Sequence, residues 1–148
     1  MTNPTHTPQA SGSIGSIILT GLIQSSKFNI TVLSRKESKA NFPAGVTVYK
    51  SDFSDTDLDA ALKNQDAVIS ALGAGGFQEQ KKIVDAAIRS GVKRFIPSEF
   101  SASSQTDAVL ELLPFFAPKA DLVEYLKGKE GDLSWTGIAA GLLFDWVC

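Results

Sequence analysis

The chain has 148 residues, with 16 acidic and 14 basic side chains and a formal net charge of −2. This length fits one domain with a hydrophobic core. The sequence has neither the basic block expected of a nucleic-acid binder nor the ~20-residue apolar run of a membrane span. Its only cysteine, Cys148, cannot form an internal disulfide, and no secretory signal is apparent. We therefore expect a cytoplasmic protein without nucleic-acid or membrane partners.

Residues 1–8 are predicted to form an irregular tail. Pro4 and Pro8 interrupt this segment, which contains no apolar run. Proline donates no hydrogen bond to a sheet ladder, so the first strand of the fold is expected to be degenerate. Without a substitute strand in residues 1–8, the neighbouring strands would lack a partner and the protein would be only marginally stable.

A glycine turn follows this tail and opens an apolar helix, predicted from Ser13 to about Gln24. The unpaired amides at the start of a helix suit a phosphate group, and spaced glycines before a helix are typical of dinucleotide-binding turns. The residues expected to bind the phosphates are Gly12, Ser13, Ile14 and Gly15.

Strands and helices alternate along the rest of the chain with short connections. We expect strands over residues 28–33, 46–49, 67–72, 92–96 and 133–138, and helices over residues 57–63, 78–89, 107–112 and 118–127. This alternation predicts an α/β fold with a doubly wound parallel sheet of the Rossmann type. Such sheets bind ligands beyond the carboxyl ends of their strands.

Two basic residues, Arg35 and Lys36, stand at the end of the strand over residues 28–33. In a dinucleotide-binding fold this position faces the adenosine ribose, where arginine accommodates the 2′-phosphate of NADP. The alternative is a pair of solvated cations at the end of a strand.

The ends of two later strands carry further candidates. Glycines after residues 67–72 would let the backbone approach a cofactor closely, although they also suit a flexible connection. The segment after Pro97 offers hydrogen-bonding groups and an aromatic ring, although it could equally be a turn with a core phenylalanine. The candidate cofactor-binding residues at these two ends are Ala71, Leu72, Gly73, Ser98, Glu99 and Phe100.

Lys119 is the candidate catalytic residue. It precedes Leu122 and Val123 by three and four residues and so shares their inward helix face. Burial and the positive end of the helix both lower the pKa of a lysine, as proton transfer requires. The alternative is a side chain that extends to solvent.

Tyr125 and Lys129 match the Y-x-x-x-K spacing of short-chain dehydrogenases, but Gly128 ends the helix between them. We therefore do not expect this pair to be catalytic. His6 lies in the tail, and one histidine with one cysteine predicts no metal site of His/Cys type.

Several segments together resemble the isoflavone-reductase-like and NmrA-like proteins, which are atypical short-chain dehydrogenases. The resemblance is carried by A-S-G-S-I-G at residues 10–15, T-V-L-S-R at 31–35, V-I-S-A-L-G at 68–73, R-F-I-P-S-E-F at 94–100 and F-A-P-K at 116–119. It implies an NADP(H)-binding Rossmann domain over residues 9–148, with Lys119 as the active-site lysine. In reductase members, hydride passes from NADPH to a small organic molecule.

The chain departs from the family pattern at Gln9, which replaces the first glycine, and at Ser101, which replaces a usual glycine. It also has about half the family length, so the C-terminal substrate lobe is expected to be missing. Three hypotheses stay open. The chain is a reductase domain with a small-molecule substrate, a non-catalytic NADP sensor of the NmrA type with a protein partner, or an inactive fragment.

Overall fold

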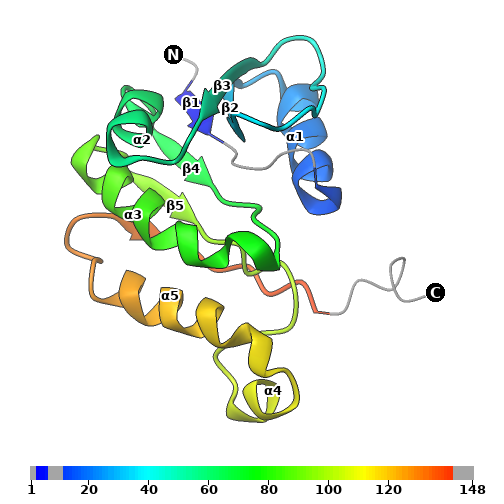
Figure 1. Ribbon diagram of the computed structural model, residues 1–148, viewed down its shortest axis with the longest axis vertical. Helices are drawn as coiled ribbons and strands as arrows, with labels where there is room; N and C mark the ends of the chain where they lie inside the picture. The colour runs from blue at the N-terminus through cyan, green and yellow to red at the C-terminus, as the bar shows by residue number, and fades with distance from the viewer. Residues whose placement is uncertain (1–2, 7–11, 142–148) are drawn as a thin grey trace.

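The protein folds around one parallel sheet. The computed structural model describes residues 3–6 and 12–141. The sheet has six strands in the order β3-β2-β1-β4-β5-β6, and all its ladders are parallel. The strands are β1 (Asn3–His6), β2 (Phe28–Arg35), β3 (Thr47–Ser51), β4 (Ala67–Ile69), β5 (Arg94–Ile96) and β6 (Ser134–Trp135). The predicted doubly wound parallel sheet is therefore confirmed (Figure 1).

The helices follow the predicted alternation. The α-helices are α1 (Ser13–Ser25), α2 (Asp55–Leu62), α3 (Gln80–Arg89), α4 (Asp107–Leu112) and α5 (Ala117–Lys127). Two 3₁₀ helices, η1 (Ala74–Glu79) and η2 (Pro114–Phe116), precede α3 and α5. Strands β4 and β5 are shorter than expected, because the segments that follow them leave the ladder and border the hollows described below.

The irregular tail expected over residues 1–8 is wrong for Asn3–His6, which form β1 at the centre of the sheet. Strand β1 pairs with β2 from Asn3 onward, but its pairing with β4 begins only at Thr5. Pro4 therefore lies where β1 has a partner on one side, the position at which a strand tolerates a missing amide donor. The substitute strand on which stability was expected to depend is present.

Helices cover both faces of the sheet. On one face, α2, α3 and α5 bury a core that includes Leu33, Leu62, Ile83 and Phe95. On the other face, Leu19 of α1 packs with residues of β2 in a smaller cluster. Each fully buried side chain of this size contributes roughly 1.5–3 kcal/mol. The larger core therefore holds β4 and β5 against α3, next to the segments that follow both strands.

Helix α1 is less buried than its apolar spacing suggests. Gly15 and Leu19 are its buried residues, whereas the apolar side chain of Ile17 is 64% exposed. The helix predicted over residues 57–63 begins two residues earlier, at Asp55, and the Ser54 hydroxyl caps it by accepting a hydrogen bond from the Asp57 amide at 3.4 Å.

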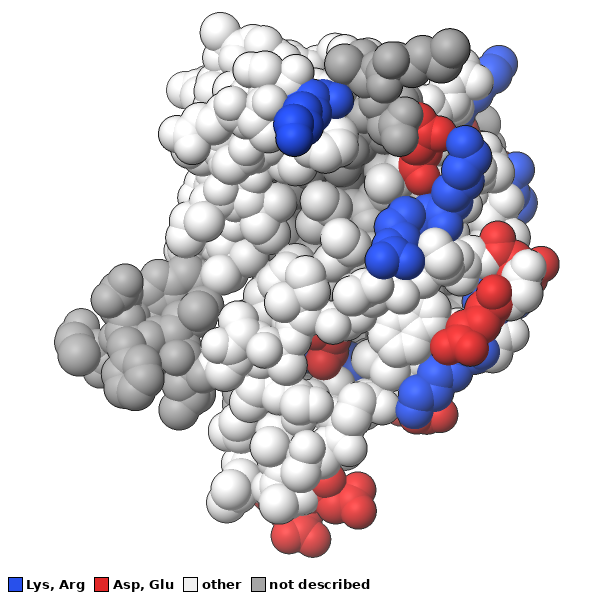
Figure 2. Space-filling model, turned by 180° about the vertical axis from the view of Figure 1, so that it is seen from behind, with Lys and Arg blue, Asp and Glu red and all other residues white. Residues whose placement is uncertain are grey.

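The face seen from behind carries mostly uncharged side chains (Figure 2). Lysines and arginines gather along one side of this view and are interspersed there with acidic residues. In the part of the chain that the structure describes, no helix is long and apolar enough to cross a membrane.

Candidate functional site

The segments that follow the parallel strands border two neighbouring hollows. The lysine cleft, of about 300 Å³, is lined by Gly12, Ser13, Ile14, Ala71, Leu72, Gly73, Phe77, Ser98, Phe100 and Lys119. The arginine groove, of about 340 Å³, is lined by Arg35, Glu37, Ser51, Asp52, Phe53, Leu72, Gly75, Gly76, Glu79 and Lys82. Leu72 lines both hollows, so they lie side by side and could hold two ends of one extended ligand.

Helix α1 points its amino-terminal end at the lysine cleft. Gly12 is the N-cap, and its carbonyl accepts the first helical hydrogen bond from the Ser16 amide at 2.8 Å. The amides of the first turn have no helical acceptor, the N-cap Gly12 has no side chain with which to cap them, and this turn carries no acidic residue. These donors and the positive helix end suit a phosphate. Gly15 is buried inside this turn and lines neither hollow.

Lys119 enters the cleft from the first turn of α5. Its side chain is only 5% exposed, which confirms the predicted inward orientation. Burial lowers the pKa of the Lys119 amine below its ordinary value of 10.5, and the negative charge of Glu99 acts in the opposite direction. The amine is thus closer to neutrality than a surface lysine, as a proton-transfer group requires.

Three groups surround the Lys119 amine. It donates a hydrogen bond to the Ser101 hydroxyl at 2.7 Å. The rings of Phe116 and Phe77 lie 4.6 Å and 5.1 Å from the amine, measured to their centroids. Aromatic faces attract a cation without solvating it as water does. The amine is therefore held in place at the wall of the cleft.

Ser98 serves mainly to join two segments of the cleft wall. Its hydroxyl donates to the Leu72 carbonyl at 2.7 Å, and its amide donates to the Gln80 side chain at 3.0 Å. The expected hydrogen-bonding groups of Ser98 are thus already used within the protein, although the residue lines the cleft.

The next two residues of the same segment, Glu99 and Phe100, line different hollows. Phe100 lines the lysine cleft, as expected of an apolar wall. Glu99 is 4% exposed and lines a different hollow beside Val123 and Trp135, where its carboxylate accepts a hydrogen bond from Ser104 at 2.8 Å. Glu99 therefore acts on the cleft through its charge rather than as part of its lining.

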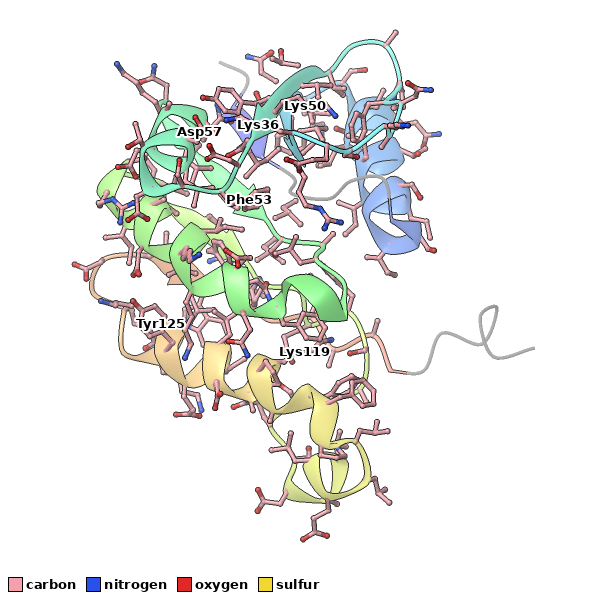
Figure 3. The ribbon with its side chains drawn as sticks, in the orientation of Figure 1. Lys36, Lys50, Phe53, Asp57, Lys119 and Tyr125 are labelled. Atoms are coloured by element: carbon pink, nitrogen blue, oxygen red, sulfur yellow. The ribbon has the colours of Figure 1, made fainter. Side chains whose placement is uncertain are left out.

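Arg35 and Lys36 also differ in their surroundings, although they are adjacent in the sequence. The Arg35 side chain lines the arginine groove and forms no ion pair with the described residues. The Lys36 amine instead contacts Asp52 at 2.9 Å and Asp57 at 3.3 Å, and it lines neither hollow. Figure 3 shows Lys36 beside Asp57. Of the two, Arg35 is the one available to a ligand phosphate.

Several residues that line the hollows were not predicted from the sequence. Asp52 and Phe53 follow β3 directly and line the arginine groove, so the rule that ligands bind beyond strand ends could have identified them. Phe53 adopts a left-handed backbone conformation with φ of 61°, which is unusual for a bulky side chain. Phe77 and Lys82 lie in η1 and α3, and no sequence signal pointed to them.

Tyr125 and Lys129 are close together but lie away from the lysine cleft. The Lys129 amine lies 5.2 Å from the Tyr125 ring centroid, and the Tyr125 hydroxyl donates to Asp85 of α3. This hydrogen bond raises the pKa of Tyr125 to about 12, which disfavours the phenolate form. Figure 3 shows Tyr125 and Lys119 at opposite ends of α5, so the tyrosine links two helices instead.

The sheet order, the open start of α1 and the hollows beyond the strand ends define a Rossmann-type dinucleotide-binding domain. Comparison with known proteins agrees. The chain belongs to the NAD(P)H-binding family, whose model matches residues 10–146. The family match confirms the expectation that the cofactor is a nicotinamide dinucleotide.

The relatives include fungal and plant-type oxidoreductases. The chain is 38% identical over 136 residues to oxidoreductase aprR of Aspergillus flavus, covering 89% of this chain and 46% of that protein. It superposes on an isoflavone reductase with a TM-score of 0.73 and 25% identity, covering 91% of this chain and 48% of the other. It also shares the fold of a leucoanthocyanidin reductase–NADPH complex from Vitis vinifera, with a TM-score of 0.75, 21% identity, and coverage of 93% and 47%.

These matches confirm the resemblance to the isoflavone-reductase-like and NmrA-like proteins. The chain spans about half the length of the curated relatives it matches.

Proposed function

We propose that this domain binds NADP(H) across the two hollows and supports NADPH-dependent reduction of a small organic molecule. The first-turn amides of α1 would hold the cofactor phosphates, and Arg35 would bind the adenosine 2′-phosphate. The nicotinamide would lie in the lysine cleft, near Lys119 and Phe100. When bound, the cofactor supplies a hydride, and the chain's own residues orient it and handle the proton.

The observation that carries this proposal is that a buried lysine and the amino-terminal turn of α1 line the same cleft. An amine with a lowered pKa exchanges a proton more readily near neutral pH. Lys119 is the titratable residue that lines this cleft among the described residues. We assign it the transfer of a proton to or from the substrate while hydride passes from the cofactor.

The arginine groove supports NADP(H) over NAD(H). Arg35 stands at the end of β2, where the ribose of a dinucleotide lies in this fold. Its guanidinium can bind a phosphate through two parallel hydrogen bonds. The solved Vitis vinifera relative was obtained with NADPH. The names of the relatives favour a small aromatic or phenolic substrate.

The direct test is titration with NADPH and NADH, followed by the fluorescence of Trp135 and the nucleotide. We expect NADPH to bind at least tenfold more tightly than NADH. Equal affinity would contradict the role of Arg35, and binding of neither would contradict the proposed site.

Turnover is tested separately, by NADPH oxidation with small conjugated carbonyl compounds and phenylpropanoids. We expect activity in the wild type and its loss in Lys119→Met. Binding without turnover would favour the NADP-sensing hypothesis instead, and neither binding nor turnover would favour the inactive fragment.

A further inference from the structure

Within the described residues, the Lys119 amine forms its one hydrogen bond with the Ser101 hydroxyl. The two residues come from different segments: Ser101 follows β5, and Lys119 lies in the first turn of α5. The Lys119 Nζ atom lies 2.7 Å from the Ser101 hydroxyl oxygen, a distance typical of a strong, charge-assisted hydrogen bond. The other neighbours of the amine, the Phe77 and Phe116 rings, cannot direct it to one point.

The backbone of Ser101 is fixed on both sides. Its amide donates to the Glu99 carbonyl, and its own carbonyl accepts from the Gly141 amide at 3.2 Å. The Ser101 hydroxyl oxygen also lies 3.4 Å from the Glu99 carbonyl oxygen, which can accept a hydrogen bond from the hydroxyl. With its hydrogen directed there, the hydroxyl oxygen offers a lone pair to the Lys119 ammonium. The acceptor is therefore preorganised.

We propose that Ser101 is a positioning residue that holds the Lys119 amine at the wall of the lysine cleft. A hydroxyl can accept a hydrogen bond from an ammonium and donate one to a neutral amine. Ser101 can therefore keep Lys119 in place in both protonation states, which a proton-transfer lysine must visit. The inference deepens the proposed function and rests on the role given there to Lys119.

Removal of the Ser101 hydroxyl should shift the pKa of Lys119 in a predictable direction. The hydrogen bond that the charged ammonium donates to Ser101 is stronger than the one that the neutral amine can accept, so loss of the hydroxyl lowers the pKa of Lys119 further. A hydrogen bond to a charged group of this kind corresponds to about one pKa unit. Glu99 is the charged residue that acts on the amine among the described residues, and the substitution of Ser101 leaves its carboxylate in place.

The test is a pH titration of the protein labelled with ¹³C at lysine Cε, with the Lys119 signal assigned by its absence in Lys119→Met. We expect Ser101→Ala to lower the pKa of Lys119 by about one unit, and Ser101→Thr to restore it. Ser103→Ala is the matched control, because the Ser103 hydroxyl accepts from the Gln105 amide instead. It should leave the titration unchanged.

An unchanged Lys119 pKa in Ser101→Ala would overturn the proposal, as would a shift that Ser101→Thr fails to restore. Should the alanine variant not fold, Ser101→Gly provides the same comparison. The titration uses the ligand-free protein, so its result is independent of whether NADPH binds or is turned over. Where turnover is measured, the alkaline limb of the pH–rate profile should shift with the titration.

Discussion

The hydroxyl of Ser98 donates to the carbonyl of Leu72 at 2.7 Å and so joins the segment after β5 to the segment after β4. Leu72 lines both the lysine cleft and the arginine groove. This one buried hydrogen bond therefore fixes the wall that the two hollows share.

Replacing Ser98 with alanine should weaken both stability and cofactor binding. The change leaves the Leu72 carbonyl without this donor, so we expect a loss of about 1–2 kcal/mol in the free energy of unfolding. The affinities for NADPH and NADH should fall by the same factor, because the wall that the two hollows share moves. Ser70→Ala is the control: Ser70 is also buried, but its hydroxyl has no partner among the described residues. Urea denaturation should show a smaller effect there; equal losses would count against the assigned role of Ser98.

Arg35→Ala should weaken NADPH binding by at least tenfold and leave NADH binding nearly unchanged. The reason is that in the proposed complex the guanidinium would contact the 2′-phosphate, which NADH lacks. Lys39→Ala removes a nearby exposed cation and should affect neither nucleotide. Fluorescence titration of both variants measures the difference. A parallel loss of NADH affinity in Arg35→Ala would show that the arginine shapes the groove instead.

Lys119→Met should abolish turnover while keeping or raising stability at pH 7. Burial of the charged amine is unfavourable, and methionine fills a similar volume without that cost. The wild type binds fewer protons when folded than when unfolded, between its lowered pKa and the unfolded value of ~10.4. Its stability therefore rises with pH in this window.

The stability advantage of Lys119→Met should thus shrink as the pH rises toward 10, as measured by denaturant unfolding at several pH values. A constant difference between the two proteins from pH 7 to pH 10 would contradict the lowered pKa.

Tyr125→Phe should destabilise the contact between α3 and α5 by about 1–2 kcal/mol at pH 7, because it removes a hydrogen bond to the Asp85 carboxylate. The pKa of Tyr125 is raised to about 12, so this contribution is complete below pH 10 and is lost between pH 10 and 12. Tyr49→Phe is the control, since the Tyr49 hydroxyl forms no hydrogen bond with the described residues. Thermal unfolding of the two variants should separate them; similar melting temperatures would argue against the helix link.

Deletion of residues 1–6 should lower the melting temperature by at least ~5 °C. The deletion removes β1 and leaves facing edges of β2 and β4 without their ladder partner. Deletion of residues 1–2 alone retains the strand and should have little effect. Cooperative unfolding at the same temperature in both deletions would mean that β1 adds little to the stability of the sheet.

The sequence was most informative where side-chain periodicity reports burial. The alternation of apolar strands and helices predicted the parallel sheet, and the spacing of Lys119 with Leu122 and Val123 predicted that its amine turns inward. Strand β1 escaped prediction because backbone pairing with two neighbours defines it, whereas its sequence has no apolar pattern.

The site was less predictable where tertiary contacts determine which groups a side chain meets. Lys36 is adjacent to Arg35, but its pairing with Asp57 depends on how α2 packs beside β3. Phe77 lies in η1, where no apolar spacing pointed to the hollow that it lines. Phe53 could have been identified only by its place directly after β3.

The central place of β1 also has a consequence for the order of assembly. Thr5 pairs with Ala67, which is distant from it in the sequence. Contacts of such large sequence separation form slowly, because a long loop must close before they are gained. Strands β2 and β3 are closer in sequence and can pair earlier. We therefore expect β1 to join a sheet in which the ladder between β2 and β3 has already formed.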